Sequence, residues 1–179
     1  MTGTMLVMTP ALHASLWAHL LPPFLEREQA AFLFCNVRED GGIITFEAVE
    51  AALLQPSDFA VQYSDYIEIT NECRIGLIKR AHALGVALAE FHSHTGPWPA
   101  GFSWSDRKGL RETVSHMKWR LKGKPYLAVV AATSGFDALA WLDDTPTPTP
   151  IVAIRAGSAI SYPTNNSLAG WTDENARSL

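Results

Sequence analysis

The chain has 179 residues, of which 47% are hydrophobic and 18% charged, as is typical of one globular domain with a substantial core. Its net charge of −4 gives no electrostatic reason to expect nucleic-acid binding, and its two cysteines, Cys35 and Cys73, are too few for a disulfide scaffold. No apolar run approaches the roughly 20 residues that span a bilayer, and no signal peptide is recognisable at the start, so we expect a cytoplasmic protein that does not enter a membrane.

The first elements predicted are a helix and a β-hairpin. Apolar side chains recur at helical spacing over residues 10–21, and two prolines then stop the helix. The apolar run over residues 30–37 is typical of a buried strand. A turn at Asp40-Gly41-Gly42 indicates that residues 43–46 return beside this strand. Residues 47–55 fit either a continued strand or a short helical turn.

The middle of the chain alternates strand, helix and strand. Residues 63–70 are rich in side chains that favour a strand. Asn71 is a suitable N-cap for a helix that ends at Gly85, and residues 86–92 form a second apolar strand. This order predicts a parallel or mixed sheet with a crossover connection.

A long helix follows, beginning at Ser105 or Asp106 and ending near Leu121. An extended, proline-rich linker is expected at residues 145–150, and strands are expected at residues 126–132, 138–142 and 151–160. We therefore predict one α/β domain over residues 1–162. The polar tail over residues 163–179 is expected to be partly disordered or to dock onto another surface.

A pair of histidines at the end of the strand over residues 86–92 carries the most specific chemical signal. Residues i and i+2 of a strand point to the same face, so His92 and His94 direct their imidazoles to one point while Ser93 points away. A loop rich in Gly, Pro and Trp then leads to Asp106. Two neutral imidazoles and one carboxylate suit Zn²⁺, and an open fourth position predicts a catalytic rather than a structural site.

These residues also carry a family resemblance. His92-Ser93-His94, eight intervening residues and then Ser103-x-x-Asp106 resemble the signature of the JAMM/MPN+ zinc metalloproteases, also called JAB domains. The loop is one residue longer than is usual in that family, and Thr95 stands where proline is common. The resemblance implies a cytidine-deaminase-like α/β fold, a mixed β-sheet flanked by helices, with Zn²⁺ held by the two histidines and the aspartate of the motif.

The resemblance assigns catalytic roles as well. Ser103 would donate a hydrogen bond to the developing oxyanion, and Ser105 is the alternative if the longer loop shifts the register. The family places a catalytic glutamate just before its first core strand, a position that Glu28 fits better than Glu26 does. Glu90 shares a strand face with the first histidine, and is either a partner that orients an imidazole or an ordinary strand carboxylate.

The function implied by the resemblance is that of a zinc-dependent isopeptidase or peptidase. Such an enzyme cleaves after the C-terminus of a ubiquitin-like modifier, either to remove the modifier from a target or to process its precursor. The short form is similar to bacterial JAB proteins that accompany activating-like and conjugating-like enzymes, some of them in antiphage defence. Trimming of a ubiquitin-like sulfur carrier and a non-catalytic JAB-fold scaffold are the alternatives, and the complete set of motif residues argues against the scaffold.

Overall fold

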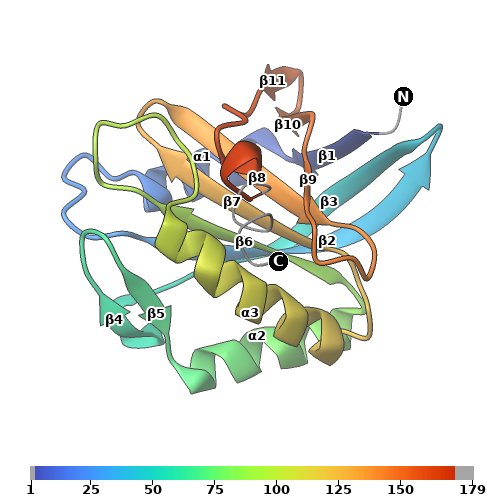
Figure 1. The fold of residues 1–179 in the computed structure, drawn as a ribbon, viewed down its shortest axis with the longest axis horizontal. Coiled ribbons are helices and arrows are strands. Elements are labelled where there is room, and N and C mark those ends of the chain that lie inside the picture. Colours follow the sequence, from blue (N-terminus) through green and yellow to red (C-terminus); the bar gives the residue numbers. More distant parts are fainter. Residues whose placement is uncertain (1–2, 172–179) are drawn as a thin grey trace.

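A curled, mixed β-sheet of nine strands runs through the part of the chain that the computed structural model describes, residues 3–171 (Figure 1). Its strands are β1 (Gly3–Met8), β2 (Ala30–Asp40), β3 (Ile43–Leu53), β6 (Ala87–Ser93), β7 (Tyr126–Ala132), β8 (Gly135–Trp141), β9 (Thr149–Pro150), β10 (Ala153–Ala156) and β11 (Ala159–Ser161). They lie in the order β11-β10-β1-β3-β2-β6-β7-β8-β9. β1 is parallel to both β3 and β10, and β6 is parallel to β7, while the other pairs are antiparallel.

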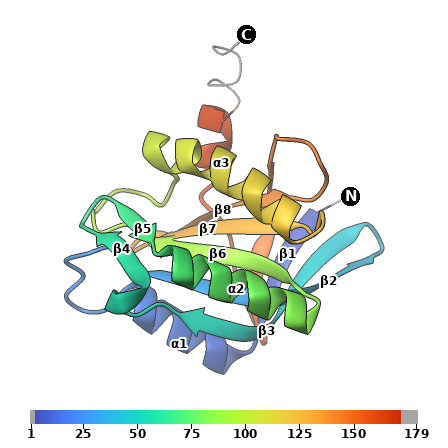
Figure 2. The same cartoon turned by 90° about the horizontal axis from the view of Figure 1, so that it is seen from below.

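Helices cover both faces of this sheet. They are α1 (Pro10–Leu20), α2 (Asn71–Leu84) and α3 (Trp104–Arg120). Leu16 of α1 packs on one face, against alternate residues of the central strands such as Leu33 and Phe91. On the opposite face, Leu77 of α2 and Val114 of α3 pack over the intervening strand residues, and Figure 2 shows α1 and α3 on opposite sides of the sheet. The predicted mixed sheet flanked by helices is therefore confirmed.

The predicted hairpin is confirmed and is longer than expected. β2 and β3 pair as antiparallel strands from their shared turn to the Ala31–Leu53 register pair, so residues 47–53 continue the strand. The predicted strand over residues 63–70 is shorter in the structure, because only β5 (Ile67–Ile69) is extended and paired. Its partner is β4 (Phe59–Gln62), which the sequence pattern does not predict, and the two form a small separate hairpin.

Two helices begin earlier than the sequence pattern indicates. The Thr70 hydroxyl accepts a hydrogen bond from the Cys73 backbone at 3.1 Å, so Thr70 and not Asn71 caps α2. Ser103 caps α3 in the same way, in place of Ser105 or Asp106. At the other end of α2, Gly85 has the left-handed φ of 69° that favours glycine at this position, as predicted.

The C-terminal part of the chain differs most from expectation. The predicted strand over residues 151–160 is a hairpin of β10 and β11 that turns at Gly157, where φ is 64°. Residues 163–171 of the predicted tail pack against the domain, with Trp171 only 1% exposed in the core beneath α3. The buried Asp137 carboxylate accepts hydrogen bonds from the backbone and hydroxyl of Ser167 at 2.8 and 2.6 Å. The rest of the predicted tail, residues 172–179, lies outside the described residues.

Candidate metal centre

Three side chains that are separated in sequence converge at the end of β6. His92 is on β6, His94 directly follows it, and Asp106 lies in the first turn of α3. The Nε2 atoms of the two histidines are 3.2 Å apart, and Asp106 Oδ2 lies 3.1 Å from the Nε2 of His94 and 3.5 Å from that of His92. Among the described residues, this is the group of three metal-binding side chains whose ligand atoms meet. The predicted convergence of the three residues is confirmed.

The spacing of these three atoms fits a tetrahedral metal site. Ligands about 2.0–2.1 Å from Zn²⁺ stand about 3.3 Å from one another in a tetrahedron. The three observed separations of 3.1, 3.2 and 3.5 Å bracket this value. Nitrogen and carboxylate donors are also the types that Zn²⁺ binds in catalytic sites. The donor set therefore suits a divalent metal ion with one position left for another ligand.

Asp106 is fixed in place by the start of its own helix. The Ser103 N–H donates to Asp106 Oδ2 at 2.7 Å, and the Asp106 N–H donates to Ser103 Oγ at 3.1 Å, which forms a reciprocal capping box. Burial alone would raise the pKa of Asp106, but its contacts with His92, His94 and Ser103 hold that pKa well below the usual range. Asp106 is therefore ionised and its acceptor oxygen is already directed at the two imidazoles.

The electrostatics of the first histidine follow from the same contacts. His92 is buried, which by itself would lower the pKa of its imidazole. Hydrogen bonding and charge from Asp106, with further charge from Glu28 and Glu90, outweigh burial and raise that pKa. The pocket is therefore strongly favourable to positive charge at this point, whether a proton or a metal ion supplies it.

The structure places Glu28, and not Glu26, at the centre. Glu28 Oε1 lies 3.8 Å from His94 Nε2, and the side chain is only 5% exposed, whereas Glu26 is exposed. Burial raises the pKa of Glu28 to about 7, although the neighbouring His92 and His94 act in the opposite direction. A carboxyl group with a pKa near neutrality can both accept and release a proton, as general acid–base catalysis requires.

Glu28 is held by residues that the sequence patterns do not single out. Its backbone N–H donates to the Tyr63 carbonyl at 2.9 Å, and its carbonyl accepts from Gln62 Nε2 at 2.9 Å. The next residue, Gln29, exchanges two hydrogen bonds with Ser93 in the middle of the His-x-His motif. The only sequence signal for these supports is that Ser93 lies between two aligned histidines, on the other face of the strand.

The two serines after the loop lie at the rim of the centre. Ser103 and Ser105 are both exposed. The Ser103 oxygen accepts the helix-capping hydrogen bond from Asp106, and its hydroxyl proton remains available to donate. The predicted role of Ser103 at an oxyanion therefore stays a prediction. Ser105 lines a cavity beside the centre.

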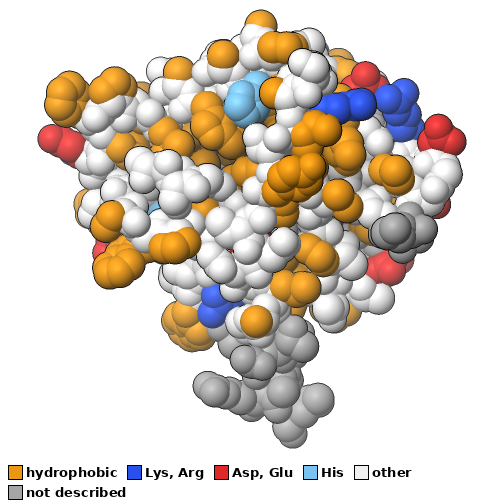
Figure 3. All heavy atoms as spheres, turned by 90° about the horizontal axis from the view of Figure 1, so that it is seen from above, with side chains coloured by type: hydrophobic (Ala, Val, Ile, Leu, Met, Phe, Trp, Pro, Cys, Tyr) orange, Lys and Arg blue, Asp and Glu red, His pale blue; other side chains and the backbone are white. Residues whose placement is uncertain are grey.

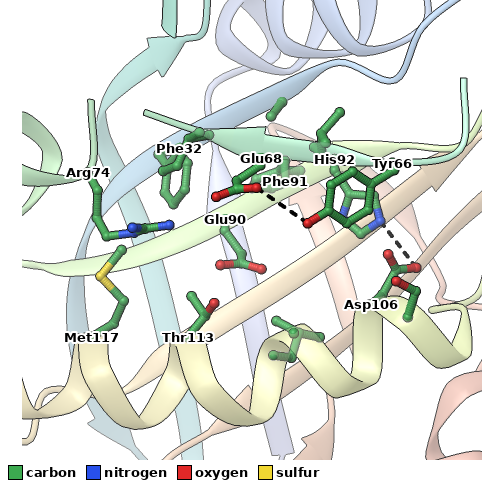
Figure 4. A pocket seen from close by; sticks show the side chains of 16 residues that line it. Phe32, Tyr66, Glu68, Arg74, Glu90, Phe91, His92, Asp106, Thr113 and Met117 are labelled. Atoms are coloured by element: carbon green, nitrogen blue, oxygen red, sulfur yellow. Dashed lines mark hydrogen bonds and ion pairs between the residues drawn. The ribbon is translucent and has the colours of Figure 1, made fainter. Parts of the chain in front are cut away.

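This cavity extends from the centre along the face of the sheet that α2 and α3 cover. It has a volume of about 230 Å³ and is bounded by His92 and Asp106 at one end and by Arg74 and Met117 at the other (Figure 4). Glu90 lies between these ends and accepts a hydrogen bond from the Tyr126 hydroxyl. Burial raises the pKa of Glu90. No hydrogen bond joins Glu90 to an imidazole among the described residues, so it faces the cavity rather than orienting a histidine.

Comparisons with known proteins do not assign the chain to a family. No protein-family model matches the sequence, and a search of curated proteins finds no match either. The helices within residues 3–171 include none that combines the length and the apolar character needed to cross a membrane.

Proposed function

We propose that this protein is a JAMM-type zinc peptidase that cleaves an isopeptide or peptide bond after the C-terminus of a ubiquitin-like modifier. The observation that carries the proposal is the convergence of His92, His94 and Asp106 with a fourth group, the buried Glu28 carboxylate, 3.8 Å from His94. Three donors suited to Zn²⁺ and one adjacent carboxylate that is not needed as a ligand are the parts that a metal-dependent hydrolase uses.

In the proposed hydrolysis, the three metal-binding side chains, Glu28 and Ser103 have separate roles. His92, His94 and Asp106 would hold Zn²⁺, which when bound supplies a Lewis acid that lowers the pKa of water and polarises the scissile carbonyl. Glu28 accepts a proton from the attacking water and passes it to the nitrogen that leaves, so its carboxylate is regenerated at the end of the cycle. The Ser103 hydroxyl donates to the carbonyl oxygen as negative charge develops on it.

The substrate is proposed from the motif resemblance. A ubiquitin-like protein would be the substrate, in conjugates or as a precursor, and activating-like and conjugating-like enzymes would act with it, as in bacterial antiphage systems. The buried carboxylate beside the donor set supports a catalytic role over a scaffold, since a scaffold needs no buried proton carrier. A ubiquitin-like sulfur carrier remains the alternative substrate.

The experiment that tests this function combines metal content with cleavage. Protein purified without chelators should contain one Zn²⁺ per chain by elemental analysis and should cleave a ubiquitin-like fusion at the modifier's C-terminus. His92→Ala should lose both the metal and the activity, while His116→Ala, an exposed histidine on α3, should lose neither. Wild-type protein that holds no zinc, or that holds zinc and cleaves no ubiquitin-like fusion, would contradict the proposal.

A further inference from the structure

The cavity beside the candidate metal centre presents two carboxylates that the proposed reaction does not use. Glu90 projects from β6 at the floor of the cavity, and Glu68 projects from β5 at its rim. Figure 4 shows the Glu90 carboxylate within the cavity, between Thr113 of α3 and Glu68. A carboxylate at the floor of a partly enclosed cavity is costly to desolvate unless something pairs with it, so the partners of Glu90 indicate what the cavity accepts.

The Glu90 carboxylate is only partly satisfied by the protein. One oxygen, Oε2, accepts a hydrogen bond from the hydroxyl of Tyr126, whose side chain is fully buried. A carboxylate offers about four acceptor positions on its two oxygens. Within residues 3–171, no hydrogen bond to the second oxygen, Oε1, is found. Tyr126 therefore fixes the orientation of Glu90 and leaves acceptor capacity facing the cavity.

The walls of the cavity are apolar on the way to this carboxylate. The apolar side chains that line it include Phe32, Ile67, Ile69, Leu110 and Met117. Such walls suit a chain of methylene groups, which lysine and arginine bury while their charged ends reach a polar partner. The volume of about 230 Å³ is enough for one long side chain and too small for a folded segment.

The charge of the lining favours a cation. Apart from His92 and Asp106, which belong to the candidate metal centre, the lining holds two carboxylates, Glu68 and Glu90, and one cationic side chain, Arg74. Arg74 donates to Asn71 Oδ1 of its own helix at 3.2 Å, and within residues 3–171 no hydrogen bond or ion pair joins it to Glu68 or Glu90. Two carboxylates against one guanidinium leave the cavity complementary to one added positive charge.

We propose that this cavity binds a basic side chain, lysine or arginine, and that Glu90 selects it. Because His92 and Asp106 form one end of the cavity, the residue that carries this side chain lies next to the bond that is cleaved; this placement rests on the proposed function. The binding of a basic side chain rests only on the cavity, its apolar walls and the Glu90–Tyr126 pair.

The binding site can be tested without any cleavage reaction. N-acetyl-arginine amide and N-acetyl-norleucine amide, which have long side chains with and without a charge, are titrated into zinc-treated protein by NMR. A charge-assisted hydrogen bond predicts that the arginine probe binds about tenfold to a hundredfold more tightly. Glu90→Gln should abolish this preference, and Glu112→Gln, an exposed glutamate on α3, should preserve it. Equal affinity of the two probes for wild-type protein would overturn the proposal, as would a preference that survives in Glu90→Gln.

A second measurement separates this inference from the proposed function. Peptides with arginine or norleucine on either side of a scissile bond are compared as substrates alongside the ubiquitin-like fusion. If nothing is cleaved but the arginine probe still binds through Glu90, the peptidase proposal fails and the binding site stands. If cleavage occurs with no preference at either position, and the probes bind equally, the binding site fails and the peptidase stands.

Discussion

Gln29 and Ser93 exchange two hydrogen bonds at the ends of the neighbouring strands β2 and β6, next to the candidate metal centre. The Gln29 N–H donates to Ser93 Oγ at 2.9 Å, and the Ser93 N–H donates to the Gln29 carbonyl at 2.9 Å. Ser93 lies between the two histidines, and Gln29 directly follows Glu28. This pair therefore fixes the Glu28 carboxylate relative to the three candidate metal-binding side chains.

The first prediction concerns this pair. Ser93→Ala should destabilise the protein by about 1–3 kcal/mol, because a buried serine is lost and the Gln29 N–H keeps no acceptor. Cleavage should fall further than stability explains, because Glu28 loses one of its supports, while zinc content should be unchanged. Chemical denaturation, elemental analysis and turnover measure the three quantities. Ser115→Ala, on the exposed side of α3, serves as the control and should change none of them.

Glu28→Gln should retain zinc and the fold, yet lose turnover by about 10²–10⁴-fold, the usual contribution of a positioned acid–base group. The amide has nearly the same shape and cannot carry the proton. The matched control is Glu26→Gln, two residues away and exposed, which should cleave normally. If Glu26→Gln is inactive and Glu28→Gln is active, the assignment of the base is wrong.

Ser103 has two roles that different substitutions separate. Ser103→Ala should cost about 1 kcal/mol of stability through loss of the N-cap, and roughly 10²–10³ in turnover through loss of the oxyanion donor. Ser103→Asp should keep most of the cap, because a carboxylate caps a helix, and should lose turnover, because an ionised carboxylate has no proton to donate. Ser103→Thr should preserve both. Melting temperature and turnover of the three variants distinguish the roles. A fully active Ser103→Asp with an inactive Ser105→Ala would assign the donor to Ser105 instead.

Removal of the metal should lower the melting temperature, and added Zn²⁺ should restore it. The reason is that an ion bound by the folded state alone stabilises that state in proportion to RT ln(1 + [L]/Kd). Differential scanning calorimetry before and after a chelator measures this shift. Asp106→Asn keeps an acceptor for the Ser103 N–H but removes the charged ligand, so its melting temperature should respond much less to zinc. An equal response in Asp106→Asn would place the metal elsewhere.

The C-terminal segment should matter for stability. Trp171 is 1% exposed and packs against Trp141 with ring centroids 5.4 Å apart. Trp171→Ala should cost about 3–5 kcal/mol, as is usual when a buried tryptophan is truncated. Trp119→Ala is the control, since Trp119 is 72% exposed. Urea denaturation compares the two variants, and equal midpoints would show that the segment contributes nothing to the folded state.

The sequence predicts the metal-binding geometry better than it predicts the supports around it. Alternation along a strand is a local rule, so the shared direction of His92 and His94 follows from their spacing alone. The contact between Gln29 and Ser93 joins residues 64 positions apart and depends on how β2 and β6 pair. The buried position of Trp171 likewise follows from packing beneath α3, because its polar neighbours in sequence form no periodic pattern.

The reciprocal hydrogen bonds between Ser103 and Asp106 have a consequence for how a metal ion would be captured. An aspartate on a free loop must lose rotational freedom when it becomes a ligand, and that lost entropy weakens the affinity. Here the folding of the first turn of α3 has already restricted the carboxylate, with Oδ2 turned toward both imidazoles. The site is thus preorganised, and the ion would bind to nearly rigid side chains. The Asp106 carboxylate loses its rotational freedom when the protein folds rather than when the ion binds.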